Sequence, residues 1–264
     1  MPKILVIGGA GYIGSHVVKE LLDGGYETLV FDDMSTGQEV NLFHEAGFIK
    51  GNILDRKALD AAMSQNIDAV IHLAAKKAVG ESMENPQKYA LNNLNGSVNI
   101  LNAMADNGVK HLVFSSSAAV YGMPIYTPVD ERHPLNPINF YGYTKVTMES
   151  LMEWYSRLKE FNYIALRYFN AVGYAADKSI TGREQNPQNL LPIIMETATG
   201  KRESFAIFGS DYDTPDGTCV RDYIHVSDLA SAHVAAVKRL MSDKKSYCLN
   251  LGTGQGISVK QIVD

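Results

Sequence analysis

The feature that most limits how this chain can fold is a group of closely spaced glycines near its start. Gly8, Gly11 and Gly14 follow an apolar run that begins at Lys3, and they precede a segment whose apolar residues recur every three to four positions as far as Leu22. Such recurrence predicts an amphipathic helix. Glycines at this spacing, between a strand and a helix, are typical of the turn on which a dinucleotide's pyrophosphate lies. The sequence therefore predicts a strand–loop–helix unit with a dinucleotide site at its start.

Strand-like and helix-like segments continue to alternate as far as about Ala171. A chain that alternates in this way forms parallel strands joined by helices. We therefore predict an α/β fold with a doubly wound parallel sheet of the Rossmann type and a helical stretch between each pair of strands. After the first strand, the expected strands cover residues 27–31, 48–50, 69–73, 112–115 and 164–168.

Two acidic residues, Asp32 and Asp33, stand at the end of the second expected strand. A carboxylate there can accept hydrogen bonds from an adenosine ribose and would repel a 2′-phosphate. The residues that follow, through Gly37, include no Arg or Lys that could hold such a phosphate. We therefore expect the cofactor to be NAD rather than NADP.

Other expected NAD contacts lie at the ends of the next strands. Asn52 and Ile53 follow the third strand and can flank the adenine. Leu73 follows the fourth strand, where simple core packing is an equally good interpretation. The expected set from this part of the chain is Gly8, Gly11, Tyr12, Ile13, Gly14, Asp32, Asp33, Asn52, Ile53, Leu73, Ala74 and Ala75.

Beyond Ala171 the sequence is richer in Gly, Asn, Pro and Asp, which favour turns. We expect residues 1–171 to form an NAD-binding Rossmann domain and residues 172–264 to form part of a smaller, loop-rich substrate-binding lobe. A strand near 247–251 can return to the main sheet. The segment from Ser258 to Val263 resembles a capped helix that is interrupted, so we expect the chain to be truncated.

Tyr141 and Lys145 are spaced so that both side chains lie on one face of a helix. A phenol with a pKa near ~10 is a poor base at neutral pH, but an adjacent ammonium and a cationic nicotinamide ring favour its ionised form. Ser115 to Ser117 stand where a parallel strand is expected to end, which is where ligands bind in such sheets. We predict that Tyr141, Lys145 and Ser117 are catalytic rather than surface residues, and Tyr143 is the lesser candidate for the base.

Longer motifs extend these patterns through nearly the whole chain: Gly8 to Ser15, Lys77 to Ser82, Ser115 to Gly122, Arg167 to Asn170, and Arg221 to Val226. In these motifs the sequence resembles the UDP-glucose 4-epimerases of the extended short-chain dehydrogenase/reductase family. The motif Lys77 to Ser82 and the segment Phe205 to Gly209 are the parts most specific to epimerases. Two positions depart from the family pattern, because Asn52 replaces a common Asp and Phe140 replaces the usual Pro.

The resemblance implies an isomerase of galactose metabolism that interconverts UDP-glucose and UDP-galactose. Hydride passes from C4 of the sugar to bound NAD, the 4-keto sugar turns its other face, and the hydride returns. Tyr141 would be the base, Lys145 would bind the nicotinamide ribose, and Ser117 would assist proton transfer.

The resemblance also implies contacts that spacing alone does not predict. Further NAD contacts would come from Lys77, Asn93, Ser115 and Tyr168, together with Tyr141 and Lys145. The UDP-sugar would be held by Lys77, Ser117, Tyr141, Asn170, Asn189, Leu190, Ala206, Phe208 and Arg221. For Leu190 and Phe208, burial in the core of the lobe is an equally good interpretation. By the same resemblance we expect a homodimer that packs through helices over 91–107 and 143–161.

Two other kinds of function remain open. Nucleotide-sugar 4,6-dehydratases and decarboxylases resemble this chain, but the dehydratases carry an acidic pair where Ala118 and Ala119 follow Ser117 here. A catalytically inactive, NAD-sensing protein could share the fold. Retention of Ser117, Tyr141 and Lys145 argues against that second alternative.

Composition narrows the range of partners. The net charge is −5 and the basic residues are scattered, so the sequence predicts neither a nucleic-acid partner nor a membrane surface. The sequence contains no apolar stretch long enough to span a bilayer and no signal peptide after Met1, and we expect a cytoplasmic protein. Cys219 and Cys248 lack metal-ligand spacing, and no metal is expected.

Overall fold

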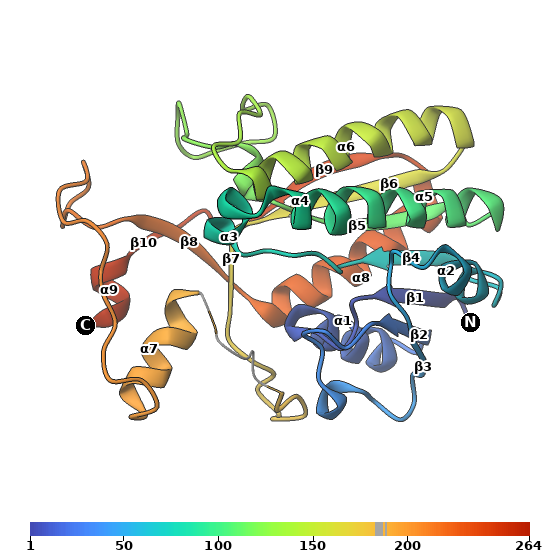
Figure 1. Cartoon of the computed structure of the whole chain (residues 1–264), viewed down its shortest axis with the longest axis horizontal. Coiled ribbons are helices and arrows are strands. Elements are labelled where there is room, and N and C mark those ends of the chain that lie inside the picture. The colour runs from blue at the N-terminus through green and yellow to red at the C-terminus, as the bar shows by residue number, and fades with distance from the viewer. Residues whose placement is uncertain (183–186, 188) are drawn as a thin grey trace.

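The computed structural model describes residues 1–182, 187 and 189–264, and its largest feature is a seven-stranded sheet in the order β3-β2-β1-β4-β5-β6-β9 (Figure 1). Every neighbouring pair of these strands is parallel. The predicted doubly wound sheet is therefore confirmed. Its strands are β1 (Lys3–Ile7), β2 (Glu27–Asp32), β3 (Gly47–Lys50), β4 (Ala69–His72), β5 (His111–Ser117), β6 (Asn162–Tyr168) and β9 (Tyr247–Leu251).

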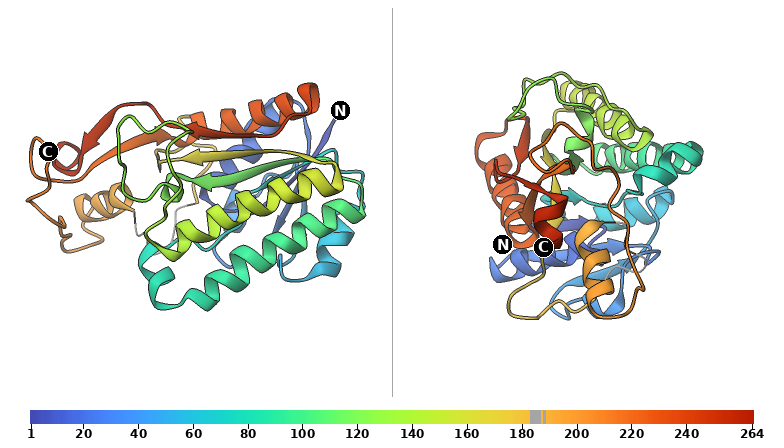
Figure 2. Two further views of the ribbon diagram at one scale, coloured as in Figure 1. Left: turned by 90° about the horizontal axis from the view of Figure 1, so that it is seen from above. Right: turned by 90° about the vertical axis from the view of Figure 1, so that its left-hand side faces the viewer.

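Helices cover both faces of this sheet (Figures 1 and 2). One face carries α2 (Arg56–Met63), α5 (Gly96–Asp106) and α6 (Phe140–Lys159), and the other carries α1 (Tyr12–Asp23) and α8 (Val226–Asp243). Alternate residues along β1 supply the two cores: Leu5 and Ile7 pack toward α2, α5 and α6, whereas Ile4 and Val6 pack toward α1 and α8. A buried parallel sheet needs apolar side chains on both faces, which is why its strands are continuous apolar runs.

The connection between β2 and β3 contradicts the expectation of a helix between every pair of strands. The described backbone there forms only a short 3₁₀ turn, η1 (Glu39–Asn41). The segment follows the glycine loop closely: a Cβ at Gly37 would lie 2.8 Å from the Cβ of Ala10, and the side-chain amide of Asn41 donates to the Ala10 carbonyl at 3.1 Å. The connection therefore braces the glycine loop instead of forming a helix that covers the sheet.

Between β4 and α5 the chain forms a nearly continuous helical rod of α3 (Val79–Glu84), α4 (Pro86–Tyr89) and a π-helical segment, η2 (Ala90–Asn95). A further 3₁₀ turn, η3 (Ala118–Val120), follows β5. Wide π turns are rare and often occur at functional sites. This one carries Asn93.

A second, three-stranded sheet lies at one end of the molecule, in the order β10-β8-β7 (Figure 1). It is built from β7 (Asn170–Val172), β8 (Val220–His225) and β10 (Gly256–Ser258), and α7 (Leu190–Ala198) and α9 (Val259–Val263) belong to the same end. The chain does not stay there. It returns through α8, and β9 pairs with β6 along Ile164 to Tyr168 to become the last strand of the main sheet.

Across the described part of the chain, every helix is too short or too polar to cross a membrane.

Candidate functional site

The glycine loop joins β1 to α1, and two of its glycines are required by the chain's own packing. Gly8 has φ of +91°, and a Cβ there would lie 2.7 Å from the backbone nitrogen of Ala74. A Cβ at Gly14 would lie 2.1 Å from the Gly8 carbonyl oxygen. At Gly11 the nearest atom to a Cβ would be 3.4 Å away, which is ordinary contact. The protein itself therefore does not demand glycine at Gly11, as expected where a ligand approaches the backbone.

The first turn of α1 offers backbone donors to such a ligand. Its N-cap is Gly11, which makes no side-chain capping bond. Uncapped N–H groups at a helix start attract anions, so the loop fits the pyrophosphate of NAD. Of the loop residues predicted to touch the cofactor, Tyr12 directs its hydroxyl to the Gly173 carbonyl at 2.6 Å, and Ile13 packs against the core. Their contact with a cofactor would be made by the backbone.

Asp32 and Asp33 end β2 beside this loop. Asp32 is 7% exposed and accepts hydrogen bonds from the backbone nitrogens of Ala10 at 3.0 Å and Met34 at 2.9 Å. Burial raises the pKa of Asp32, and the two backbone donors oppose that change. Asp33 accepts from the side-chain amide of Asn52 at 2.9 Å. Asp32 thus fixes the loop's shape and keeps lone pairs that can accept further hydrogen bonds, while Asn52 is hydrogen-bonded to the neighbouring Asp33.

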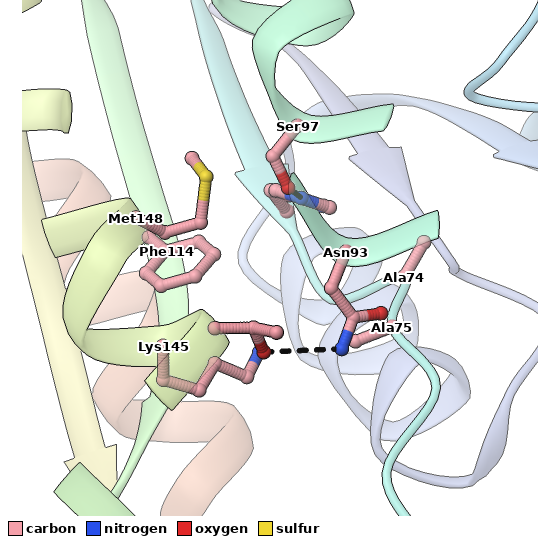
Figure 3. Close-up of a pocket in the computed structure, with 9 residues that line it drawn as sticks. Ala74, Ala75, Asn93, Ser97, Phe114, Lys145 and Met148 are labelled. Atoms are coloured by element: carbon pink, nitrogen blue, oxygen red, sulfur yellow. Dashed lines mark hydrogen bonds between the residues drawn. The ribbon is translucent and has the colours of Figure 1, made fainter. Parts of the chain in front are cut away.

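The remaining predicted residues of this region divide between core and pocket. Ile53 is 6% exposed and would clash with a Cβ placed at Gly96, and Leu73 packs against the core. Ala74 and Ala75 line a small pocket, across which Asn93 and Lys145 face one another (Figure 3). For Leu73 the structure therefore agrees with core packing, one of the two interpretations from the sequence.

Asn93 joins two separate segments of this site. Its side-chain oxygen accepts from the Lys76 backbone nitrogen at 2.8 Å, and its amide nitrogen donates to the Lys76 carbonyl at 2.9 Å and to the Thr144 hydroxyl at 3.3 Å. Thr144 precedes Lys145 on α6, so Asn93 links α6 to the loop that bears Lys76 and Lys77. The Lys77 side chain on this loop is exposed.

Tyr141 and Lys145 lie on the first turns of α6. The helix start is held by two side chains, because Asn139 accepts from the Gly142 nitrogen at 2.8 Å and Ser82 accepts from the Tyr141 nitrogen at 3.1 Å. The Lys145 ammonium lies 5.7 Å from the centre of the Tyr141 ring. Both side chains therefore share one face, as the spacing predicts.

Lys145 is 4% exposed, and its Nζ donates to the Ser115 carbonyl at 2.7 Å. Burial lowers the pKa of Lys145 to about 7, against the opposing effect of the negative charge on Glu149. Burial raises the pKa of Tyr141, while a hydrogen bond with Ser117 lowers it. The described side chains alone therefore do not make Tyr141 acidic.

The serine run at the end of β5 is divided between the two faces of the sheet. Ser116 points toward α6, where its hydroxyl donates to Glu149 at 2.5 Å. Glu149 also receives three hydrogen bonds from Arg167 on β6, at 3.0, 3.2 and 2.6 Å, and both side chains are 5% exposed. Arg167 continues to the Tyr121 hydroxyl at 2.9 Å.

This buried network anchors α6 to the two strands beneath it. Sequence reasoning assigned Glu149 no role and gave Arg167 only a place in a motif. The available signal was a carboxylate one helical turn beyond Lys145, on the same helix face.

The residues predicted to hold a sugar nucleotide lie mostly on the small sheet and its loops. The side-chain amide of Asn170, on β7, donates to the Asp222 carbonyl at 2.8 Å. Arg221, on β8, is exposed, and Phe208 is 84% exposed. Ala206 and Asn189 are also exposed, and Leu190 is half-buried at the start of α7. Burial of Phe208 in the lobe's core, one of the two interpretations from the sequence, is therefore wrong.

Comparison with known proteins agrees with this geometry. The model of the NAD dependent epimerase/dehydratase family matches residues 4–252. The UDP-glucose 4-epimerases of Lactobacillus helveticus and Bacillus subtilis are 47% and 45% identical over 99% and 98% of this chain, which spans 80% of each relative's length.

Among solved structures, UDP-glucose 4-epimerase from Brucella ovis in complex with NAD superposes with a TM-score of 0.97 at 43% identity, over 100% of this chain and 81% of that one. The enzyme from Bifidobacterium longum, in complex with NAD⁺ and UDP, gives a TM-score of 0.94 at 38% identity, over 98% and 81%. This chain is a member of the NAD dependent epimerase/dehydratase family.

Proposed function

We propose that this chain is a UDP-glucose 4-epimerase, an NAD-dependent enzyme that interconverts UDP-glucose and UDP-galactose. The observation that carries the proposal is the pairing of Tyr141 with buried Lys145, whose ammonium lies 5.7 Å from the Tyr141 ring centre, at the carboxyl edge of a sheet whose first loop fits a dinucleotide. The similarity to curated epimerases over nearly the whole chain supports the substrate assignment.

When bound, NAD accepts a hydride from C4 of the sugar and later returns it. We propose that the glycine loop holds its pyrophosphate and Asp32 its ribose, while Asn93, Ser115 and Tyr168 lie at its nicotinamide end. The buried Lys145 ammonium would hydrogen-bond the nicotinamide ribose while keeping its bond to the Ser115 carbonyl.

Tyr141 then takes the proton of the sugar 4-hydroxyl, with Ser117 hydrogen-bonded to both oxygens. Burial holds the Tyr141 proton tightly in the protein alone, so the positive nicotinamide ring is needed to lower the phenol's pKa. The base would therefore become effective only when the oxidised cofactor is present. The proton returns to the sugar after the 4-keto group has turned.

The UDP-sugar would lie between the main sheet's carboxyl edge and the lobe. We propose that the lobe consists of the small sheet with α7 and α9, since α8 and β9 pack in the main sheet's layers. Asn170, Asn189, Leu190, Ala206 and Phe208 would line the nucleotide side. Arg221 would face the diphosphate, because a guanidinium matches phosphate oxygens in pairs.

A 4,6-dehydratase is the nearest enzymatic alternative. Elimination of water needs carboxyl groups after the serine, but here η3 begins with Ala118 and Ala119. An inactive, NAD-sensing protein would have no need to retain Ser117, Tyr141 and Lys145 in one arrangement.

We also propose a cytoplasmic homodimer. The outer face of α6 carries exposed Tyr143, Trp154 and Leu158, which are 52%, 57% and 69% exposed, and Leu91 beside it is 53% exposed. Helices α5 and α6 pack side by side (Figure 2). Large exposed apolar side chains gathered on neighbouring helices favour association. Sedimentation that shows only monomer at micromolar concentration would contradict this arrangement.

The test of function is incubation of the purified protein with UDP-galactose, without added NAD, followed by chromatography. We expect UDP-glucose. A 4-keto-6-deoxy product would indicate a dehydratase, and unchanged UDP-galactose with NAD still bound would indicate a sensing protein.

A further inference from the structure

His233 lies at the centre of α8, on the face of the main sheet opposite Glu149, and is fully buried. Its Nε2 lies 3.1 Å from the hydroxyl of Ser115, although 118 residues separate the two along the chain. Its Nδ1 lies 2.7 Å from the carbonyl oxygen of Leu229, one turn earlier on α8.

These two contacts fix where the ring proton resides. A carbonyl oxygen can only accept, so Nδ1 must carry the hydrogen. In the neutral ring Nε2 then has a lone pair and accepts from Ser115. Burial lowers the pKa of His233 to about 4, so the ring stays neutral at physiological pH.

The direction of this hydrogen bond decides whether the Ser115 hydroxyl can donate to, or only accept from, its other neighbours. Since its hydroxyl proton points at His233, the oxygen lone pairs of Ser115 are left to accept from another donor. The Tyr168 ring also lies against His233, with 6.3 Å between centres. The Ser115 carbonyl meanwhile accepts from Lys145 at 2.7 Å.

We propose that His233 is a positioning residue for the cofactor's reactive end: it orients Ser115 by the hydrogen bond with its hydroxyl, and its ring packs against Tyr168. This proposal rests on the proposed function for its role in turnover, but not for its role in NAD binding. Because His233 is fully buried, it acts through Ser115 and not on the substrate itself. It sets the direction of the hydrogen-bond chain that runs from the Leu229 carbonyl through the imidazole ring to the Ser115 hydroxyl.

The first test compares NAD affinity, by calorimetry, in the whole chain and its variants. His233→Leu keeps a buried apolar volume but removes the acceptor, and we expect NAD to bind about five- to tenfold more weakly, the usual loss for one hydrogen bond. His233→Gln restores an acceptor and should recover much of that affinity. Val237→Ala, one turn further along α8 and equally buried, loosens packing without touching Ser115 and should bind NAD as wild type does.

A double-mutant cycle separates positioning from packing. If His233 acts through the Ser115 hydroxyl, Ser115→Ala should weaken NAD as much as His233→Leu does, and the double variant should be no weaker than either. Additive losses, or wild-type affinity in folded His233→Leu, would overturn the proposal. Turnover should fall with NAD affinity while the affinity for UDP stays within about twofold of wild type.

Nitrogen-15 NMR of the unmutated protein gives a test that does not depend on the variants folding. We expect His233 to be neutral at pH 7, with hydrogen on Nδ1 and none on Nε2. Hydrogen on Nε2 would make Ser115 the acceptor and would refute the proposal. If wild type binds NAD but does not epimerise UDP-galactose, the proposed function fails, whereas the binding and NMR results still decide the role of His233.

Discussion

The carboxyl edge of the main sheet and the small three-stranded sheet differ in how fully their polar side chains are satisfied within the chain. At the main-sheet edge, Asn93, Ser115 and Lys145 are 3%, 1% and 4% exposed, and each has protein partners. On the small sheet and its loops, Arg221 and Phe208 face solvent. The first region is assembled before any ligand arrives.

This difference indicates a division of labour. Buried polar groups with complete networks are rigid, which suits atoms that must meet a hydride donor and a proton acceptor in one geometry. Exposed side chains gain their contacts only on binding, which suits recognition of a nucleotide that must enter and leave. Variants at the main-sheet edge should therefore affect chemistry and stability strongly, and variants in the lobe should affect binding alone.

The largest effect should come from Tyr141→Phe, which removes the proton acceptor and almost no volume. We expect turnover of UDP-galactose to fall by roughly 10²- to 10⁴-fold, the range for loss of a general base, while bound NAD is retained. Tyr143→Phe is the matched control, since Tyr143 is 52% exposed on the same helix, and its turnover should equal wild type. A comparable loss in both variants would remove Tyr141 from the base's role.

Glu149→Ala should have the next largest effect, because it leaves Arg167 buried without its carboxylate partner. Breaking a buried pair in this way costs about 3–5 kcal/mol of unfolding free energy, measurable by urea denaturation. Glu153→Ala, which removes an exposed pair with Arg157 on the same helix, should cost less than about 1 kcal/mol. If both variants lost the same unfolding free energy, the buried pair beside the main-sheet edge would contribute no more to stability than an exposed pair.

Lys145 supplies a smaller, pH-dependent effect. Its pKa of about 7 in the folded chain lies below its ordinary 10.5, so between these values the unfolded chain binds the extra proton. Stability from this group therefore rises with pH across that window, by up to about 1.4 kcal/mol per pH unit. Without added cofactor, Lys145→Met should flatten the rise between about pH 7.5 and 9.5. Exposed Lys57→Met should keep the wild-type slope, and an unchanged slope in Lys145→Met would argue against a strained ammonium.

The smallest effect on stability should come from Phe208→Ala in the lobe. Because the ring is 84% exposed, the free energy of unfolding should change by less than about 0.5 kcal/mol. Affinity for UDP should fall about tenfold, if the ring becomes buried against the nucleotide. Met195→Ala, 58% exposed on α7, is the control for a lost surface side chain. A stability loss without a binding loss would reverse the assignment of Phe208.

Local patterns predicted the parts of this molecule that depend on local spacing. The glycine loop and the placement of Tyr141 and Lys145 on one helix face follow from residues within a few positions of each other. The expected helix between β2 and β3 was wrong because the connection packs against Ala10 and Asp32, and that contact is long-range.

The buried polar pairs were missed for a related reason. Glu149 contacts Arg167, which lies 18 positions later on β6, and Ser115 contacts His233, which lies 118 positions later on α8. A single sequence shows that such residues exist but not which of them meet. In the lobe, the sequence alone did not decide whether Phe208 is a core residue or a binding residue. The structure shows that its ring is exposed.

The return of β9 to the main sheet has a consequence for how the protein is made. During synthesis, β6 emerges with one edge unpaired, and its partner at Tyr247–Leu251 is reached only after the whole small sheet except β10 has been made. An exposed edge strand invites pairing with other chains, and contacts this distant in sequence form slowly. The nascent chain should therefore pass through a stage that needs protection from aggregation until α8 and β9 have docked.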